Sequence, residues 1–212
     1  MESRGSENFR SLYRWRSSEG CAIAQTKLAG AWSYEDILSF PDDDRPYEIY
    51  EIIERALYEI PSPTSAHTAT IFNLIALLPP IVANVQVRSF TALQDVFIPS
   101  GDLIQPDILV VLSDGDARVE LRGIVGPPHL VIEVVSPSNR GRDLLTRRAL
   151  YARADVREYW LVDPDARTIE ILALDHDTFH LAAAVSGDEA PVSLLPGPLL
   201  TRADELPIRI ES

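Results

Sequence analysis

Cysteine, lysine and long apolar runs are scarce in this chain of 212 residues. The single cysteine, Cys21, excludes an internal disulfide and a zinc site built from several cysteines. No apolar run approaches the roughly 20 residues that a membrane-spanning helix needs. The arginine-rich start of the chain is not followed by the apolar segment of a signal peptide. We therefore expect a soluble, cytoplasmic protein without a membrane partner.

Positive charge is scarce as well, because the chain contains 19 Lys and Arg but 32 Asp and Glu, which gives a formal net charge of −13. Such a surface repels phosphate on average, so bulk electrostatics cannot drive non-specific binding to nucleic acid. The net charge does not exclude a local basic cleft. Lys27 is the only lysine. A mechanism that requires a lysine amine therefore has one candidate, close to the N-terminus.

The order of predicted elements indicates the fold class. Residues 1–30 are polar, rich in Ser and Arg and without periodicity, which predicts a disordered tail, and residues 31–212 are expected to form a single domain. A helix is followed by strands, a second helix, several strands, a third helix and further strands. This order predicts an α+β fold with a mixed β-sheet flanked by helices. No glycine-rich phosphate-binding loop is present, so nucleotide-binding folds lose support.

Periodicity and capping residues place the individual elements. Ser33 with Asp36 resembles a capping box, Thr64 or Ser65 caps the second helix, and Asp143 caps the third. The helices are predicted over 34–40, from 64 or 65 to 78, and over 143–154. Strands are predicted as a pair within 47–60 and over 81–87, 93–98, 108–112, 130–135, 159–162, 168–174, 179–185 and 192–195. The inner side of the third helix is expected to carry Leu144, Leu145, Ala149, Ala152 and Tyr151, the last as a core aromatic.

Two acidic residues stand out because of their apolar surroundings. Asp107 opens the apolar strand 108–112, and Glu133 lies inside the apolar run 130–135. A carboxylate within an apolar strand is costly unless it is paired or binds a metal. Two such carboxylates on adjacent strands would form an oxygen site suited to Mg²⁺ or Mn²⁺. Alternatively, Asp107 is a turn residue, and Glu133 faces solvent or forms a buried ion pair with an arginine.

These segments, taken together, resemble a known family. The stretches that carry the resemblance are 50–52, 58–63 with His67, 106–108, 130–138, 143–151, 156–163 and 196–197. The run Glu-Val-Val-Ser-Pro-Ser, followed downstream by Glu-Tyr-Trp, is specific in combination. The chain thus resembles the Uma-type restriction endonucleases, a widespread bacterial group within the PD-(D/E)xK nuclease superfamily. The resemblance covers about residues 33–206 and implies a restriction-endonuclease-like core.

The resemblance also implies an activity and a set of site residues. Asp107 and Glu133 would hold a divalent metal, Mg²⁺ or Mn²⁺, and Glu51 would complete the acidic cluster, unless the register is three residues earlier at Glu48. The expected activity is metal-dependent hydrolysis of phosphodiester bonds in DNA. The Asp-Gly turn usual in the family is replaced here by Glu54-Arg55.

The lysine of the superfamily motif is missing. Val135 occupies its usual place, and the place on the following helix, four residues after Asp143, is taken by Arg147. Arginine stays protonated and cannot be a general base, although it can bind phosphate and stabilise negative charge. Alternatively, Arg147 is a helix-surface cation, and Arg148 takes the role if the helix is rotated. Lys27 lacks a preorganised position.

Two functions therefore remain in view. The first is a metal-dependent endonuclease in which Arg147 contacts the scissile phosphate. The second is a catalytically silent nuclease fold with a binding or regulatory role. His67 either contacts the site or is a packed or capping histidine, and the second interpretation is favoured. A homodimer would present two sites to two strands, but the sequence offers no specific interface.

Overall fold

The computed structural model describes residues 32–38, 49–60, 63–77, 87–91, 94–112, 115–135 and 142–186. These residues belong to two compact units. The smaller unit contains the described residues 32–38 and 49–60 together with Gly101–Ile104, and the larger unit contains the other described residues. The predicted tail 1–30 and the predicted strand 192–195 lie outside the described residues, so both stay predictions. No helix among the described residues is long and apolar enough to cross a membrane.

The smaller unit contains a capped helix and a hairpin. Its elements are α1 (Tyr34–Leu38), β1 (Ile49–Ile53), β2 (Ala56–Ile60) and β5 (Leu103–Ile104). The capping box is confirmed, because the Ser33 backbone N–H donates to Asp36 over 2.9 Å and the Asp36 N–H returns to Ser33 Oγ over 3.4 Å. The predicted strand pair is confirmed as well, since β1 pairs with β2 in antiparallel register and β5 joins β1 at its other edge.

The hairpin turn between β1 and β2 uses two residues in the left-handed region. Glu54 has φ 51° and Arg55 has φ 67°, the combination of a type I′ turn that normally carries Asn-Gly or Asp-Gly. The Glu54 N–H donates to Asp102 Oδ1 over 2.6 Å, and the Arg55 carbonyl accepts from the Trp32 N–H over 3.2 Å. These contacts stabilise the turn, although neither Glu54 nor Arg55 is of a residue type that favours the left-handed conformation.

Arg55→Gly is therefore expected to stabilise the protein. Glycine removes a left-handed penalty of about 1–2 kcal/mol and adds an entropic cost of about 0.5–1 kcal/mol. The expected net gain in the free energy of unfolding is about 0.5–1 kcal/mol, measured by urea denaturation. Ala149→Gly, at an exposed position inside the helix Arg142–Arg153, is the control and should lower stability by about 1 kcal/mol. A loss of stability in Arg55→Gly would contradict this account of the turn.

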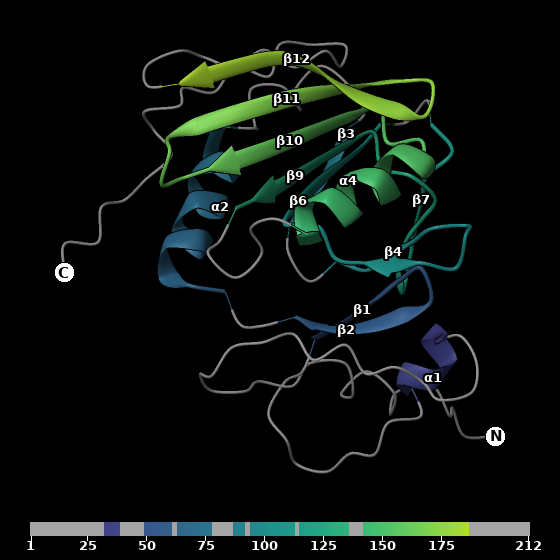
Figure 1. Ribbon diagram of the computed structural model, residues 1–212. Coiled ribbons are helices and arrows are strands. Elements are labelled where there is room, and N and C mark those ends of the chain that lie inside the picture. The colour runs from purple at the N-terminus through teal and green to yellow at the C-terminus, as the bar shows by residue number, and fades with distance from the viewer. Residues whose placement is uncertain are drawn as a thin grey trace. The chain divides into compact units, whose positions relative to one another are not determined.

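The larger unit is built around one six-stranded sheet, with strand order β12-β11-β10-β9-β6-β3 (Figure 1). The strands are β3 (Val87–Thr91), β6 (Ile108–Leu112), β9 (Leu130–Val134), β10 (Glu158–Asp163), β11 (Thr168–Asp175) and β12 (Thr178–Ser186). Strands β9 and β10 run parallel, and the other neighbours run antiparallel. The mixed sheet that the sequence predicts is therefore confirmed. The same unit also contains β4 (Val96–Phe97), β7 (Arg118–Glu120) and β8 (Gly123–Val125), in which β8 pairs with both β4 and β7.

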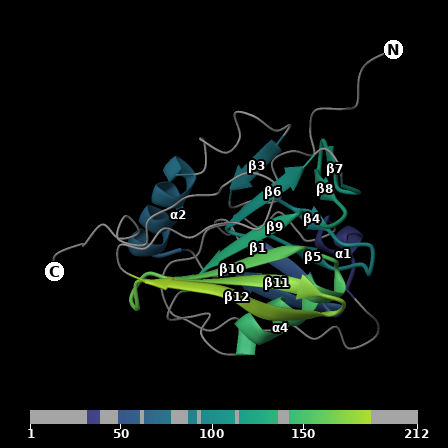
Figure 2. The ribbon, with the colours of Figure 1, turned by 90° about the horizontal axis from the view of Figure 1, so that it is seen from above.

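Among the described residues, two helices cover this sheet, α2 (Ser65–Leu77) and α4 (Arg142–Arg153). Figure 2 shows them on opposite sides of strands β9 and β10. On the α2 side, Ile71 and Leu74 pack against alternate residues of four strands. These strand residues are Ile108, Val110, Leu112, Leu130, Ile132, Val134, Trp160, Val162, Ile169 and Ile171. Because side chains alternate along a strand, the residues between them face the α4 side.

Helix α4 is rotated relative to the sequence prediction. Leu145 is 68% exposed and Ala149 is exposed as well, whereas Leu150 and Tyr151 are buried. The predicted inner positions of Leu145 and Ala149 are therefore wrong, while those of Tyr151 and Ala152 are confirmed. The helix turns its Arg147 and Tyr151 face to the sheet because a buried carboxylate lies there. The side chain of Asp143, the predicted cap, lies outside the described residues.

Candidate functional site

Two neighbouring strands bring Asp107 and Glu133 together. Strands β6 and β9 pair Val110 with Leu130 and Ile108 with Ile132. Asp107 is the residue before β6, and its Oδ2 accepts the backbone N–H of Val134, the residue that follows Glu133 in β9. The two carboxylates that the sequence selects are therefore neighbours at one end of the sheet.

Glu133 is held by two residues of α4. Its side chain is 4% exposed, and its Oε1 accepts from Arg147 Nη1 over 3.0 Å and from the Tyr151 hydroxyl over 2.5 Å. Arg147 Nη1 also lies 3.4 Å from the Tyr151 oxygen. The neighbouring cation, Arg148, instead donates to the backbone carbonyl of Phe179. Of the two arginines considered from the sequence, Arg147 is thus the one that reaches Glu133, and the buried ion pair is present.

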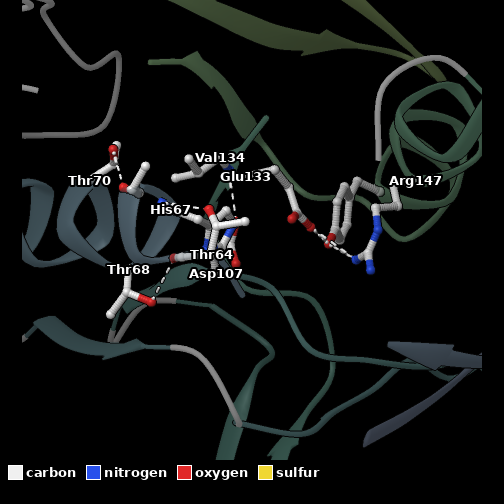
Figure 3. A network of polar contacts seen from close by, with 10 residues as sticks. Thr64, His67, Thr68, Thr70, Asp107, Glu133, Val134 and Arg147 are labelled. Carbon is white, nitrogen blue, oxygen red and sulfur yellow. Dashed lines mark hydrogen bonds and ion pairs between the residues drawn. The ribbon is translucent and has the colours of Figure 1, made fainter. Parts of the chain in front are cut away.

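Asp107 is held from the other side of the sheet. Its Oδ2 accepts the Val134 N–H over 2.7 Å and lies 3.1 Å from Nε2 of His67 on α2 (Figure 3). Because Asp107 uses only Oδ2 in these contacts, its Oδ1 has no partner among the described residues. His67 Nδ1 likewise has no partner there, although it is buried. The cap of α2 is Thr64, whose Oγ1 accepts the His67 N–H over 3.2 Å, so His67 is not the capping residue.

The charges of the site act on the pKa of His67. Burial lowers this pKa, but the hydrogen bond and the charge of Asp107, together with the charge of Glu133, outweigh burial and raise it above 6.5. The folded protein therefore binds the proton on His67 more tightly than the unfolded chain does, and protonation of His67 stabilises the fold. Tyr159, which is also buried near these charges, has a raised pKa because burial and the charge of Glu133 disfavour its ionised form.

The raised pKa of His67 predicts a pH dependence of stability. The stabilisation of the fold by protonated His67 is complete below the ordinary pKa of 6.5. It is lost as the pH rises through the raised pKa of the folded state. We expect His67→Gln to lose more stability relative to the unmodified chain at about pH 5.5 than at about pH 8.5. Urea unfolding at the two pH values measures this difference. An equal loss at both values would contradict a charged His67–Asp107 pair.

The third predicted carboxylate belongs to the smaller unit. Glu51 lies in β1, is 1% exposed and pairs in register with Tyr58 of β2. The alternative Glu48, like Lys27, lies outside the described residues. Within the part of the chain that the structure describes, no three Asp, Glu, His or Cys side chains are grouped as a metal site. The part of Glu51 in metal binding therefore stays a prediction.

His67 and Tyr151 make polar contacts at the site that the sequence does not predict. The sequence favours a packed or capping role for His67, whereas its ring contacts the carboxylate of Asp107 in the structure. Tyr151 was assigned to the core; it is indeed buried, but its hydroxyl also reaches Glu133. The sequence contains one indication of the Tyr151 contact, because Tyr151 follows Arg147 by four residues and therefore lies on the same helix face. His67 offered no such signal, because its contact depends on how α2 packs on the sheet.

Comparisons with known proteins agree with this architecture. Residues 34–203 match the Uma2 family, described as "Putative restriction endonuclease". This match covers most of the chain, and the protein therefore belongs to that family. No curated protein matches the chain.

A solved structure shows the same fold. It is the crystal structure of "a putative nuclease belonging to DUF820" from Anabaena variabilis ATCC 29413. The TM-score is 0.58 at 22% sequence identity, and the match covers 82% of this chain and 97% of the other. The chain therefore shares the fold of that protein, and the α+β fold class that the sequence predicts is confirmed.

Proposed function

We propose that this protein is an endonuclease that hydrolyses phosphodiester bonds in DNA with Mg²⁺ or Mn²⁺ bound at Asp107 and Glu133. The observation that carries the proposal is that Asp107, just before β6, accepts a hydrogen bond from the residue next to Glu133 in β9, while Arg147 pairs with Glu133. Membership of a restriction endonuclease family supports the same assignment.

The donor set fits such an ion. Mg²⁺ binds proteins through one or two carboxylates and completes its octahedron with waters and substrate phosphates. Asp107 Oδ1 has no partner among the described residues, while Oδ2 is fixed by two donors, which leaves one oriented oxygen for a metal. A divalent cation bound there supplies positive charge for the phosphoryl transition state and activates water.

Arg147 would act as a cation and not as a base. Its guanidinium stays protonated, so it cannot take a proton from the attacking water. It can bind phosphate oxygens in a bidentate manner and stabilise the charge that develops in the transition state. In the structure this guanidinium donates to Glu133, so binding of a phosphate involves either sharing or exchange of that partner. Glu51 would assist as the third carboxylate.

Metal titration and a cleavage assay test the proposal together. Isothermal calorimetry with Mn²⁺ and Mg²⁺ should show binding to the unmodified chain and none to the Asp107→Asn, Glu133→Gln double variant. Nicking of supercoiled plasmid should require the same ions and stop in EDTA. Binding that survives in the double variant would remove these carboxylates from the metal site. A plasmid that stays intact at every metal concentration would contradict the proposed reaction.

A second function is favoured by one observation, the close ion pair between Arg147 and Glu133. An arginine in the place of the family's lysine, bound to a carboxylate of the site, suits a nuclease fold that binds DNA or a partner without cleaving it. This function predicts binding in a gel-shift assay together with undetectable nicking.

A further inference from the structure

The hydroxyl of Tyr151 is the least expected polar group at the site. Tyr151 is 0% exposed, and its ring packs in an aromatic cluster with Tyr159, at a centroid distance of 5.3 Å, which in turn contacts Phe179. Its hydroxyl donates to Glu133 Oε1 and accepts from Arg147 Nη1. Packing alone does not require this oxygen, because a phenylalanine would fill the same volume.

The neighbouring tyrosine provides the comparison. Tyr159 is 1% exposed and belongs to the same cluster, yet its hydroxyl has no hydrogen-bond partner among the described residues. A buried hydroxyl without a partner costs free energy and fixes nothing. Of the two buried hydroxyls, the one on Tyr151 is therefore the one that orients a carboxylate of the site.

The two α4 donors on Glu133 have different freedom to leave it. Arg147 has several N–H groups on a long side chain that is 12% exposed, so it can turn to a phosphate. Tyr151 has a single proton to donate and a ring fixed by its packing. When Arg147 turns to a phosphate, Tyr151 is the α4 donor that stays on Oε1.

We propose that Tyr151 is a positioning residue, which holds the Glu133 carboxylate in the orientation that binds the metal while Arg147 engages the phosphate. The inference rests on the proposed function, since it concerns the same metal site. Groups that hydrogen-bond a metal ligand in this way typically change metal affinity about 10–100-fold when they are removed.

Tyr151→Phe and Tyr159→Phe form a matched pair, because each removes one buried hydroxyl from the same cluster. Calorimetric titration with Mn²⁺ alone measures the metal affinity of each full-length variant. Thermal unfolding, followed by circular dichroism, measures stability separately. We expect Tyr151→Phe to weaken Mn²⁺ binding by about 10-fold or more. Tyr159→Phe should bind Mn²⁺ as the unmodified chain does and should keep or raise the unfolding midpoint.

Three outcomes would overturn the inference, and they are distinguishable. Unchanged Mn²⁺ affinity in Tyr151→Phe would show that the hydroxyl does not position Glu133. Equal weakening in both variants would assign the effect to packing of the aromatic cluster. Absence of Mn²⁺ binding by the unmodified chain would contradict the proposed metal site itself, and the inference with it, before any variant is compared.

Discussion

Glu133→Gln is expected to lower metal-dependent DNA cleavage by about 10³-fold or more, because loss of a charged metal ligand removes several kcal/mol of transition-state stabilisation. The substitution keeps the shape of the side chain and an oxygen for Tyr151 and Arg147. It removes the negative charge, which a divalent cation requires and which Arg147 balances at 3.0 Å. Plasmid nicking at saturating Mg²⁺ measures the rate.

The chain offers a matched control for this variant in Glu158. Glu158 is as buried as Glu133, at 1% against 3%, and lies on the neighbouring strand β10. In the β9–β10 register Glu158 pairs with Leu130 in the first of five pairs, whereas Glu133 pairs with Leu161 in the fourth, so the two glutamates are three pairs apart along the ladder. Glu158 accepts from Trp160 Nε1 over 2.5 Å. Glu158→Gln should keep its cleavage rate, and an equal loss in both variants would indicate a general effect of removing a buried charge.

The strands that carry the site could be predicted from the sequence because they are buried on both faces. Such strands are continuous apolar runs, and the predicted run 108–112 coincides with β6, while 130–135 exceeds β9 by one residue. The carboxylates at Asp107 and Glu133 stand out against these runs. By contrast, β7 was not predicted, because its three residues are all exposed and carry no apolar periodicity.

The contacts between elements could not be predicted in the same way. The contact of Asp107 with Val134, next to Glu133, depends on the pairing of strands separated by a long connection, which no local pattern encodes. The rotation of α4 is set by the buried carboxylate of Glu133 in the sheet, which requires hydrogen-bond donors, and not by the apolar stripe of the helix. Leucine at 145 is exposed so that Arg147 and Tyr151 can reach the buried carboxylate, whose cost without partners exceeds the gain from burying one leucine.

Arg147→Lys is the variant that separates an active nuclease from a silent one. A lysine amine at this position can lose its proton and accept one from water, which an arginine cannot do. General-base assistance typically contributes about 10²–10⁴-fold to a rate. We therefore expect Arg147→Lys to raise metal-dependent nicking by about 100-fold or more, since the ammonium group on the same helix face can replace the guanidinium next to Glu133.

Arg148→Lys is the control for this substitution. It makes the same chemical change one residue along α4, but Arg148 donates to the Phe179 carbonyl and not to a site carboxylate, so its nicking rate should stay unchanged. Equal rates in Arg147→Lys and the unmodified chain, with Mn²⁺ bound to both, would show that Arg147 does not occupy the position of the missing base. If both are also inactive on DNA that they bind, the site serves binding. A rise confined to Arg147→Lys would instead identify a nuclease whose rate is limited by the arginine it carries.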